Sequence, residues 1–414
     1  MKTRLRLSGI FASGVLAWAG AACADDTIEP ARAPAPAVAL TFKPDAGLVY
    51  QSGDFKITAW GFAERVFDPD GPDSFRRVRQ GAEIDFPRVT TRLRPALVYE
   101  IDLTNSSFFD NGFGGREGFG RRNLENLFIA LQDPDDPGRF RVLVGENTHI
   151  LSRDDNLSSG NLPTINRSLI LEELGSVNGF GTQFGVQVQT VLPNGATLQL
   201  SAQDGRGSFN AAEPRYTVGN SLAAKIILTP INDPQGGRKL TVGLAADRTG
   251  EIQNRTFTLA TAIGQAPLGG LPATGDRRSW EVDAAYTFPV GSHPVTVEGE
   301  AIHSSFSGSR TEALGGYGMV QWSLFDTPRG GDLDLFVRYD IVRLGQEGVS
   351  GRATQQALRT GINYNLPGAN RLANLHLEYA RNTISGPSTI VTGDRESDEF
   401  RVELRVSLQQ YVRH

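Results

Sequence analysis

The stretch EFRVELRVSLQ, residues 399–409, carries an apolar residue at every second position. The apolar members are Phe400, Val402, Leu404, Val406 and Leu408, and the residues between them are charged or polar. Successive side chains of a β-strand point to opposite faces, so this segment predicts a strand with one apolar and one charged face. Such a strand suits a wall that has lipid on one side and water on the other.

The same alternation recurs along the chain. Segments 91–103 (TRLRPALVYEIDL) and 331–342 (GDLDLFVRYDIV) again set apolar residues against Arg, Asp and Glu. We predict sixteen strands, near residues 55–66, 75–86, 91–103, 123–132, 138–146, 182–191, 195–203, 219–228, 238–247, 280–288, 294–303, 315–325, 332–343, 355–365, 373–381 and 399–409. Most have about nine to twelve residues, enough for a tilted strand to cross a bilayer, whereas strands of soluble proteins average about five or six.

The links between these segments alternate in length. Short links made of turn residues, such as 133–137 and 192–194, take turns with long ones, such as 104–122 and 147–181. This rhythm is typical of outer-membrane barrels, which have short periplasmic turns and long outer loops. The predicted fold class is all-β, a transmembrane antiparallel up-and-down barrel of about sixteen strands occupying residues 46–414.

The first residues have the layout of a secretory signal peptide. A basic start precedes the apolar run 10–19, and small residues surround Cys23 ahead of Asp25. We predict a signal peptide at 1–24 and a Pro/Ala-rich linker at 25–45; in an alternative reading, Cys23 is a lipid-modified terminus. Export and a lipid-facing barrel together predict the bacterial outer membrane as the location, with outer-membrane lipid as a partner.

Composition and motifs favour a channel over an enzyme. The net charge of -5 provides no basic surface for nucleic acid. His149, Ser152, Asp154 and Asp155 supply the residue types of a hydrolase triad, but no G-x-S-x-G nucleophile motif accompanies them. We expect no enzymatic activity, no cofactor and no metal. The alternatives are an outer-membrane hydrolase, a secretion or adhesion anchor, and a soluble periplasmic protein that binds a ligand.

The charged faces of a barrel this wide line a water-filled lumen. The predicted pore-lining residues are Arg77, Arg79, Arg92, Arg94, Arg139, Arg141, Arg401 and Arg405. Basic positions concentrate early, together with Lys56, whereas the later strands contribute Glu281, Asp283, Glu298, Glu300, Asp332, Asp334 and Asp340. We expect a basic wall to face a partly acidic wall, and the early arginines to favour anions, because arginine binds carboxylate and phosphate oxygens. Alternatively, the charges only keep the lumen wall hydrated and do not set selectivity.

The long link 147–181 is the natural constriction loop. It carries charges of both signs, and the predicted constriction residues are Glu146 at its start, Arg153, Asp154, Asp155 and Arg167. We expect it to fold into the lumen; the alternative is an outer surface loop. Aromatic residues near strand ends are expected to form interfacial girdles: Trp60, Tyr99, Trp280, Tyr286, Phe288, Trp322 and Tyr364.

Two stretches resemble a known family. FRRVRQGAEIDF (75–86) and GRFRVLVGENTHILSRDDNLSS (138–159) are similar to segments of the phosphate-selective porins of the O and P type and of related trimeric outer-membrane porins. The matching residues are Arg76, Arg77, Arg79, Gly138, Arg139, Phe140, Gly145 and Glu146. The resemblance implies a homotrimeric, passive channel for small hydrophilic solutes, with a preference for anions or phosphate.

Overall fold

The computed structural model describes residues 38–43, 47–67, 74–103, 124–157, 162–176, 182–204, 219–257, 271–326, 332–366, 373–387, 391 and 395–407. The predicted signal peptide, and the predicted linker up to residue 37, lie outside the described residues. In this part of the chain no helix has both the length and the apolar composition of a membrane-spanning helix.

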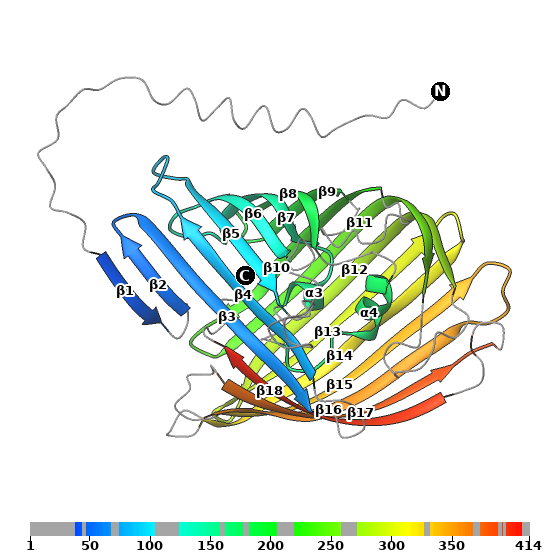
Figure 1. Ribbon diagram of the computed structural model, residues 1–414. Coiled ribbons are helices and arrows are strands. Elements are labelled where there is room, and N and C mark those ends of the chain that lie inside the picture. Colours follow the sequence, from blue (N-terminus) through cyan, green and yellow to red (C-terminus); the bar gives the residue numbers. More distant parts are fainter. Residues whose placement is uncertain are drawn as a thin grey trace, which may run out of the picture. The chain divides into compact units, whose positions relative to one another are not determined.

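Sixteen antiparallel strands form a closed barrel (Figure 1). They are β3 (Phe55–Phe67), β4 (Ser74–Asp85), β5 (Arg94–Asp102), β6 (Leu124–Gln132), β7 (Phe140–Thr148), β8 (Thr182–Val191), β9 (Thr197–Asp204), β10 (Asn220–Asp233), β11 (Arg238–Thr256), β12 (Pro272–Val290), β13 (His293–Phe306), β14 (Thr311–Asp326), β15 (Asp332–Gln346), β16 (Ala353–Asn365), β17 (Ala373–Ser385) and β18 (Arg395–Ser407). Each strand pairs with its neighbours in sequence, and β18 pairs with β3 to close the ring. Every predicted segment overlaps one of these strands, so the predicted fold class is confirmed.

The register puts the charged faces inside and the apolar faces outside. In β18, Phe400 and Val406 are exposed, whereas Glu403 and Arg405 are buried. The same division holds in β15, where Val337 and Tyr339 are exposed and Arg338 is buried. The alternation therefore predicted the two faces of the wall correctly in these strands.

The expected aromatic girdle is wrong at Trp60. Trp60 pairs with Gly81 and shares the register of the buried Thr58 and Glu64, so its side chain faces the lumen. The other six aromatic residues have the register of the outward face. Around Trp60 the sequence ITAWGFA has apolar residues on both faces. The alternation therefore could not predict which face of β3 points to the lumen.

A further hairpin precedes the barrel. It consists of β1 (Val38–Lys43) and β2 (Gly47–Ser52), and β2 pairs with β3 over residues 55–59. On the same edge of β3, β18 pairs with residues 62–67. Strand β1 lies within 25–45, so the part of that segment from Val38 to Lys43 is a strand and not a linker.

A small apolar core lies inside the barrel. Helix α4 (Leu169–Ser176) packs against β14, β15 and β16, whose inward residues include the apolar Ala313, Val342 and Ala353. The core includes Leu169, Ile170, Leu171 and Leu174 of the helix, with Ile302, Phe306, Val342, Leu344 and Ile384 of the wall. A Cβ at Gly315 would lie 2.9 Å from the Cβ of Ile170, so glycine permits this close approach. One side of the lumen is therefore filled.

Candidate functional site

The constriction segment crosses the lumen, and inward side chains of the wall hold its backbone. The carboxylate of Glu300 on β13 accepts a hydrogen bond from the Asp154 amide at 3.0 Å. Glu378 on β17 accepts one from the Ile165 amide at 2.8 Å. A backbone inside a barrel has no ladder partner, so these acceptors supply the hydrogen bonds that burial would otherwise remove.

Basic and amide side chains of the wall hold the carbonyl groups of the same segment. Lys225 on β10 donates to the Leu151 carbonyl at 3.0 Å, and Asn363 on β16 to the Pro163 carbonyl at 2.8 Å. Arg405 on β18 donates to the carbonyls of Leu162 and Thr164, at 2.7 and 3.1 Å. Arg359 on β16 donates to the carbonyls of Asn166 and Arg167, at 3.0 and 3.1 Å. The expectation that this loop folds into the lumen is confirmed, and the outer-surface alternative is wrong for these residues.

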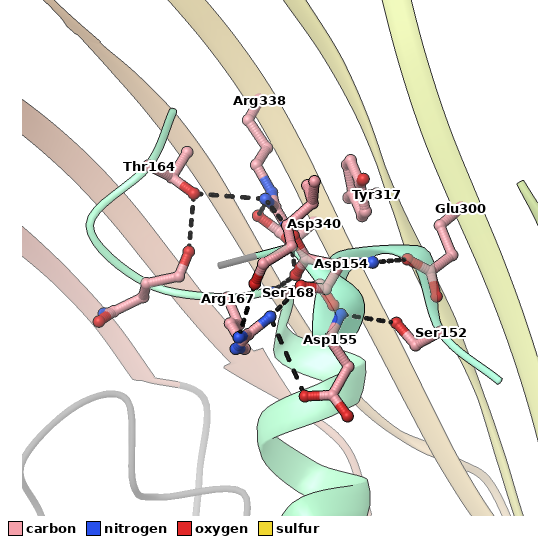
Figure 2. Close-up of polar contacts among 12 residues, drawn as sticks. Ser152, Asp154, Asp155, Thr164, Arg167, Ser168, Glu300, Tyr317, Arg338 and Asp340 are labelled. Carbon is pink, nitrogen blue, oxygen red and sulfur yellow. Dashed lines mark hydrogen bonds and ion pairs between the residues drawn. The ribbon is translucent and has the colours of Figure 1, made fainter. Parts of the chain in front are cut away.

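Arg338 of β15 is the centre of the docking site (Figure 2). Its guanidinium lies 3.3 Å from the carboxylate of Asp154 on the loop and 3.1 Å from that of Asp340 on its own strand. It also donates to the Thr164 hydroxyl at 3.3 Å. The ring of Tyr317 lies 3.8 Å below the guanidinium carbon, a cation-π contact inside the barrel. One wall cation thus binds two separate parts of the loop.

Helix α3 (Arg153–Asn156) presents Asp154 to Arg338. The Ser152 hydroxyl accepts from the Asp155 amide at 3.1 Å, which is an N-cap, and acidic residues follow in the first turn. Burial opposes the charged form of Asp154, but the cation of Arg338 and further donors outweigh it and lower the pKa of this carboxyl. Asp154 is therefore ionised in the docked loop.

Arg153 and Arg167 of the docked loop bind the wall and the loop itself, and both remain partly exposed. Arg153 lies 3.3 Å from Glu298 and 3.7 Å from Asp283. Arg167 donates to the backbone carbonyl of Asp154 (Figure 2) and to that of Leu157. The loop's arginines are thus placed by the same contacts that dock the loop.

The opposite wall, β3 to β7, carries the early arginines. Arg79 pairs with Glu100 at 3.1 Å, Arg77 with Glu64 at 3.6 Å, and Arg94 with Asp85 at 4.0 Å. Each of these cations thus has a carboxylate partner, and some carboxylates are shared: Asp85 also pairs with Lys56, and Glu64 with Arg405. Arg338, Arg359 and Arg405 lie on the later wall. The expected division into a basic and an acidic wall is therefore wrong; both walls are mixed.

Several predicted site residues lie elsewhere than expected. Arg92 and Arg139 are exposed residues of the turns before β5 and β7, not inward strand positions. Glu146 belongs to β7, where it is buried, and not to the constriction loop. Arg141 faces the lumen, and Arg401 pairs with Glu399 at 2.7 Å on the inner face of β18. The side chain of Asp332 is outside the described part of the structure.

The basic member of each pair near the open lumen is the more exposed one. Lys56 exposes 37% of its side chain and its partner Asp85 only 5%. Arg77 exposes 19% of its side chain and Glu64 exposes 0%. Arg153 exposes 26% and Asp283 exposes 4%. Long basic side chains reach past their shorter partners while their stems pack on the wall. The water-facing charge of these pairs is therefore mainly positive.

The components of a hydrolase do not assemble around His149. Its Nε2 faces both Ser221 at 3.2 Å and Asp247 at 3.8 Å, while Nδ1 accepts from the Leu151 amide at 3.3 Å. A triad needs the serine and the carboxylate on different ring nitrogens. Burial lowers the pKa of His149 to about 4, so the ring is a neutral structural group. Among the described residues, no cluster of His, Cys, Asp and Glu could hold a metal ion.

Comparison with known proteins supports the fold. No family model and no curated protein matches the sequence. OmpT, an outer membrane protein of Vibrio cholerae, is similar in its trimer form with a TM-score of 0.54 and 11% identity, covering 85% of this chain and 98% of that one. The anion-selective porin from Comamonas acidovorans is similar with a TM-score of 0.51 and 13% identity, covering 85% and 99%.

These similarities concern the fold and do not distinguish the O and P type, which stays a prediction. The fold, the lipid-facing outer surface and the loop docked in the lumen agree with one another. The chain is a porin-like β-barrel of the bacterial outer membrane.

Proposed function

We propose that the protein is a water-filled channel for passive diffusion of small hydrophilic solutes, with a preference for anions. The exposure of the basic partner in the lumen pairs carries this proposal. A solute in the lumen meets guanidinium and ammonium groups first, because the carboxylates lie behind them against the wall. Fixed charges replace part of a solute's hydration and thereby select its sign.

The pairing of each arginine also favours passage over tight binding. An anion that approaches Arg79 competes with Glu100, which already lies 3.1 Å away. Conduction needs attraction strong enough for entry and weak enough for release, and a partly neutralised cation meets both conditions. We therefore propose a general anion preference, with phosphate as one of the solutes. The proposal contains no catalytic step and no cofactor.

We also propose a homotrimer in outer-membrane lipid. A trimer form is described for the similar OmpT of Vibrio cholerae, and the outer face of this barrel is apolar.

Reversal potentials across a planar bilayer in a KCl gradient test the function. The wild type should favour chloride at low salt, and the preference should fade near 1 M, where the screening length falls to about 3 Å. The triple variant Arg77→Gln, Arg79→Gln and Arg141→Gln should shift the reversal potential towards cations. The matched control is Arg92→Gln with Arg139→Gln, which removes two turn arginines and should leave selectivity unchanged. A wild-type channel without anion preference would refute the proposal.

A further inference from the structure

Two aromatic side chains line the open wall opposite the docked loop. Trp60 of β3 faces the lumen, and its indole ring fills the space above Gly81 of β4, where a Cβ would lie 2.6 Å from the ring. Phe128 of β6 has the same inward register, since it pairs with Val98 of β5, which is buried next to Glu83. Both aromatic residues remain partly exposed.

Val98 of β5 connects the two aromatic positions: it pairs with Phe128 and lies diagonal to Gly81, while Glu83 and Glu100 occupy the adjoining inward positions. We call Trp60, Val98 and Phe128 the apolar patch. Gly81 and Phe128 lie on β4 and β6, and adjacent strands are about 4.8 Å apart, so the patch extends roughly 10 Å around the wall. Glycine at position 81 is what lets the indole ring lie against the backbone. Because Trp60 and Phe128 are partly exposed, a solute in the lumen can contact this patch.

Basic groups flank the patch. Arg79 is diagonal to Trp60 across the β3–β4 pair, because Trp60 opposes Gly81 and Phe62 opposes Arg79. Diagonal neighbours lie about 7 to 8 Å apart, within reach of long side chains. On the other side, the guanidinium carbon of Arg141 lies 5.5 Å from the centre of the Phe128 ring. A planar anion on the patch would thus meet a cation at either edge.

We infer that Trp60, Val98 and Phe128, flanked by Arg79 and Arg141, form a binding subsite for small aromatic carboxylates in the channel. This inference rests on the proposed anion channel and names a solute class for it. The solute ring would displace water from the apolar patch and contact the aromatic side chains, while its carboxylate would bind an arginine. Glu100 and Glu83 compete for the same cations. Glu100 accepts from Arg79 at 3.1 Å, so the solute carboxylate would share or displace this contact. Glu100 would keep the Asn126 amide as a donor, and Glu83 would keep that of Gln132.

Block of the KCl current by added solutes in single-channel recordings tests this subsite. Four probes separate charge from ring: benzoate, acetate, cyclohexanecarboxylate and benzylammonium. Benzoate should block at concentrations about five- to tenfold below those of acetate and cyclohexanecarboxylate, the gain that one aromatic contact provides. Benzylammonium should block less than benzoate. Equal block by benzoate and acetate would overturn the inference, and so would stronger block by benzylammonium.

Two variants locate the effect. Trp60→Leu should reduce the benzoate-to-acetate ratio towards one, and Phe128→Leu should reduce it as well, which provides a second variant if the first does not form channels. The control Trp280→Leu removes an exposed tryptophan of the outer face and should keep the wild-type ratio. A ratio that survives both lumen substitutions would overturn the subsite. Since the reversal potential is measured on the same channels, a wild-type channel that prefers anions but does not distinguish benzoate from acetate refutes only the subsite.

Discussion

Replacing Arg338 with Met should release the constriction loop. The buried group around it contains two cations, Arg338 and Arg359, and two carboxylates, Asp154 and Asp340, so it is neutral as a unit. Without Arg338 one negative charge is uncompensated. Asp340 retains Arg359 at 3.5 Å, so Asp154 is the group that loses its partner. Removing one member of a buried ion pair costs about 3 to 5 kcal/mol.

This cost falls on the docked loop, because Asp154 regains water when the loop leaves the wall. Each 1.4 kcal/mol is a factor of about ten, so the ratio of docked to undocked loop should fall by roughly one hundredfold to a few thousandfold. Single-channel recordings should show a larger mean conductance with frequent transitions to an open level.

The double variant Arg338→Met with Asp154→Asn is the matched control. It removes both charges, keeps an acceptor for the Ser168 amide, and should return the conductance towards the wild-type value, because replacing both members of a buried pair costs little. Wild-type conductance in the single variant would refute the reasoning. A double variant as perturbed as the single one would do so too.

Four further predictions follow from the geometry. Val406→Arg puts a charge on the exposed outer face of β18 and should cost about 2 to 4 kcal/mol near the membrane midplane, seen as a lower temperature of gel-mobility change, whereas Val406→Ala should be tolerated. Arg405→Leu, which alternation alone would class as mild, should raise conductance because it frees two loop carbonyls and leaves Glu403 without its cation. Wild-type conductance in this variant would show that Arg405 does not hold the loop. Shortening the chain between residues 156 and 166 should raise conductance further, and unchanged conductance in a folded barrel would contradict the constriction. The unfolded chain protonates His149 below about pH 6.5, but the folded chain only near 4, so stability should fall as the pH decreases through this window. His149→Gln should flatten that decrease in thermal melts, and a wild-type slope would contradict the assignment.

The strands and their two faces were predictable because both depend on local periodicity. Long alternating segments such as 331–342 need only their own sequence to define a lipid face and a water face. Alternation fails where both faces are apolar, as at Ile341 and Val342 of β15, whose inward member packs in the core beneath α4. Two consecutive apolar residues in an otherwise alternating strand were therefore the sequence signal that this side of the lumen is filled.

The pairing of charges was not predictable in the same way. Arg338 and Asp154 are separated by 184 residues, and only the closed barrel with its docked loop brings them together. The sequence placed Asp340 in an acidic wall, but it could not show that Arg338 and Arg359 lie beside it. Arg92 and Arg139 were misplaced for a simpler reason: strands β5 and β7 begin three and two residues later than the predicted segments 91–103 and 138–146.

The shared edge of β3 also bears on the order of assembly. Residues 402–407 must find residues 62–67 across almost the whole chain, and the entropy cost of closing a loop grows with its length. The β2–β3 hairpin has a link of only two residues, and such hairpins form in about 1 to 10 μs. Strand β2 should therefore cover residues 55–59 of β3 long before β18 arrives. An open strand edge invites pairing with other chains, so this early cover shortens the exposed edge of the unfinished barrel. The final closure then needs only six residue pairs between β18 and β3.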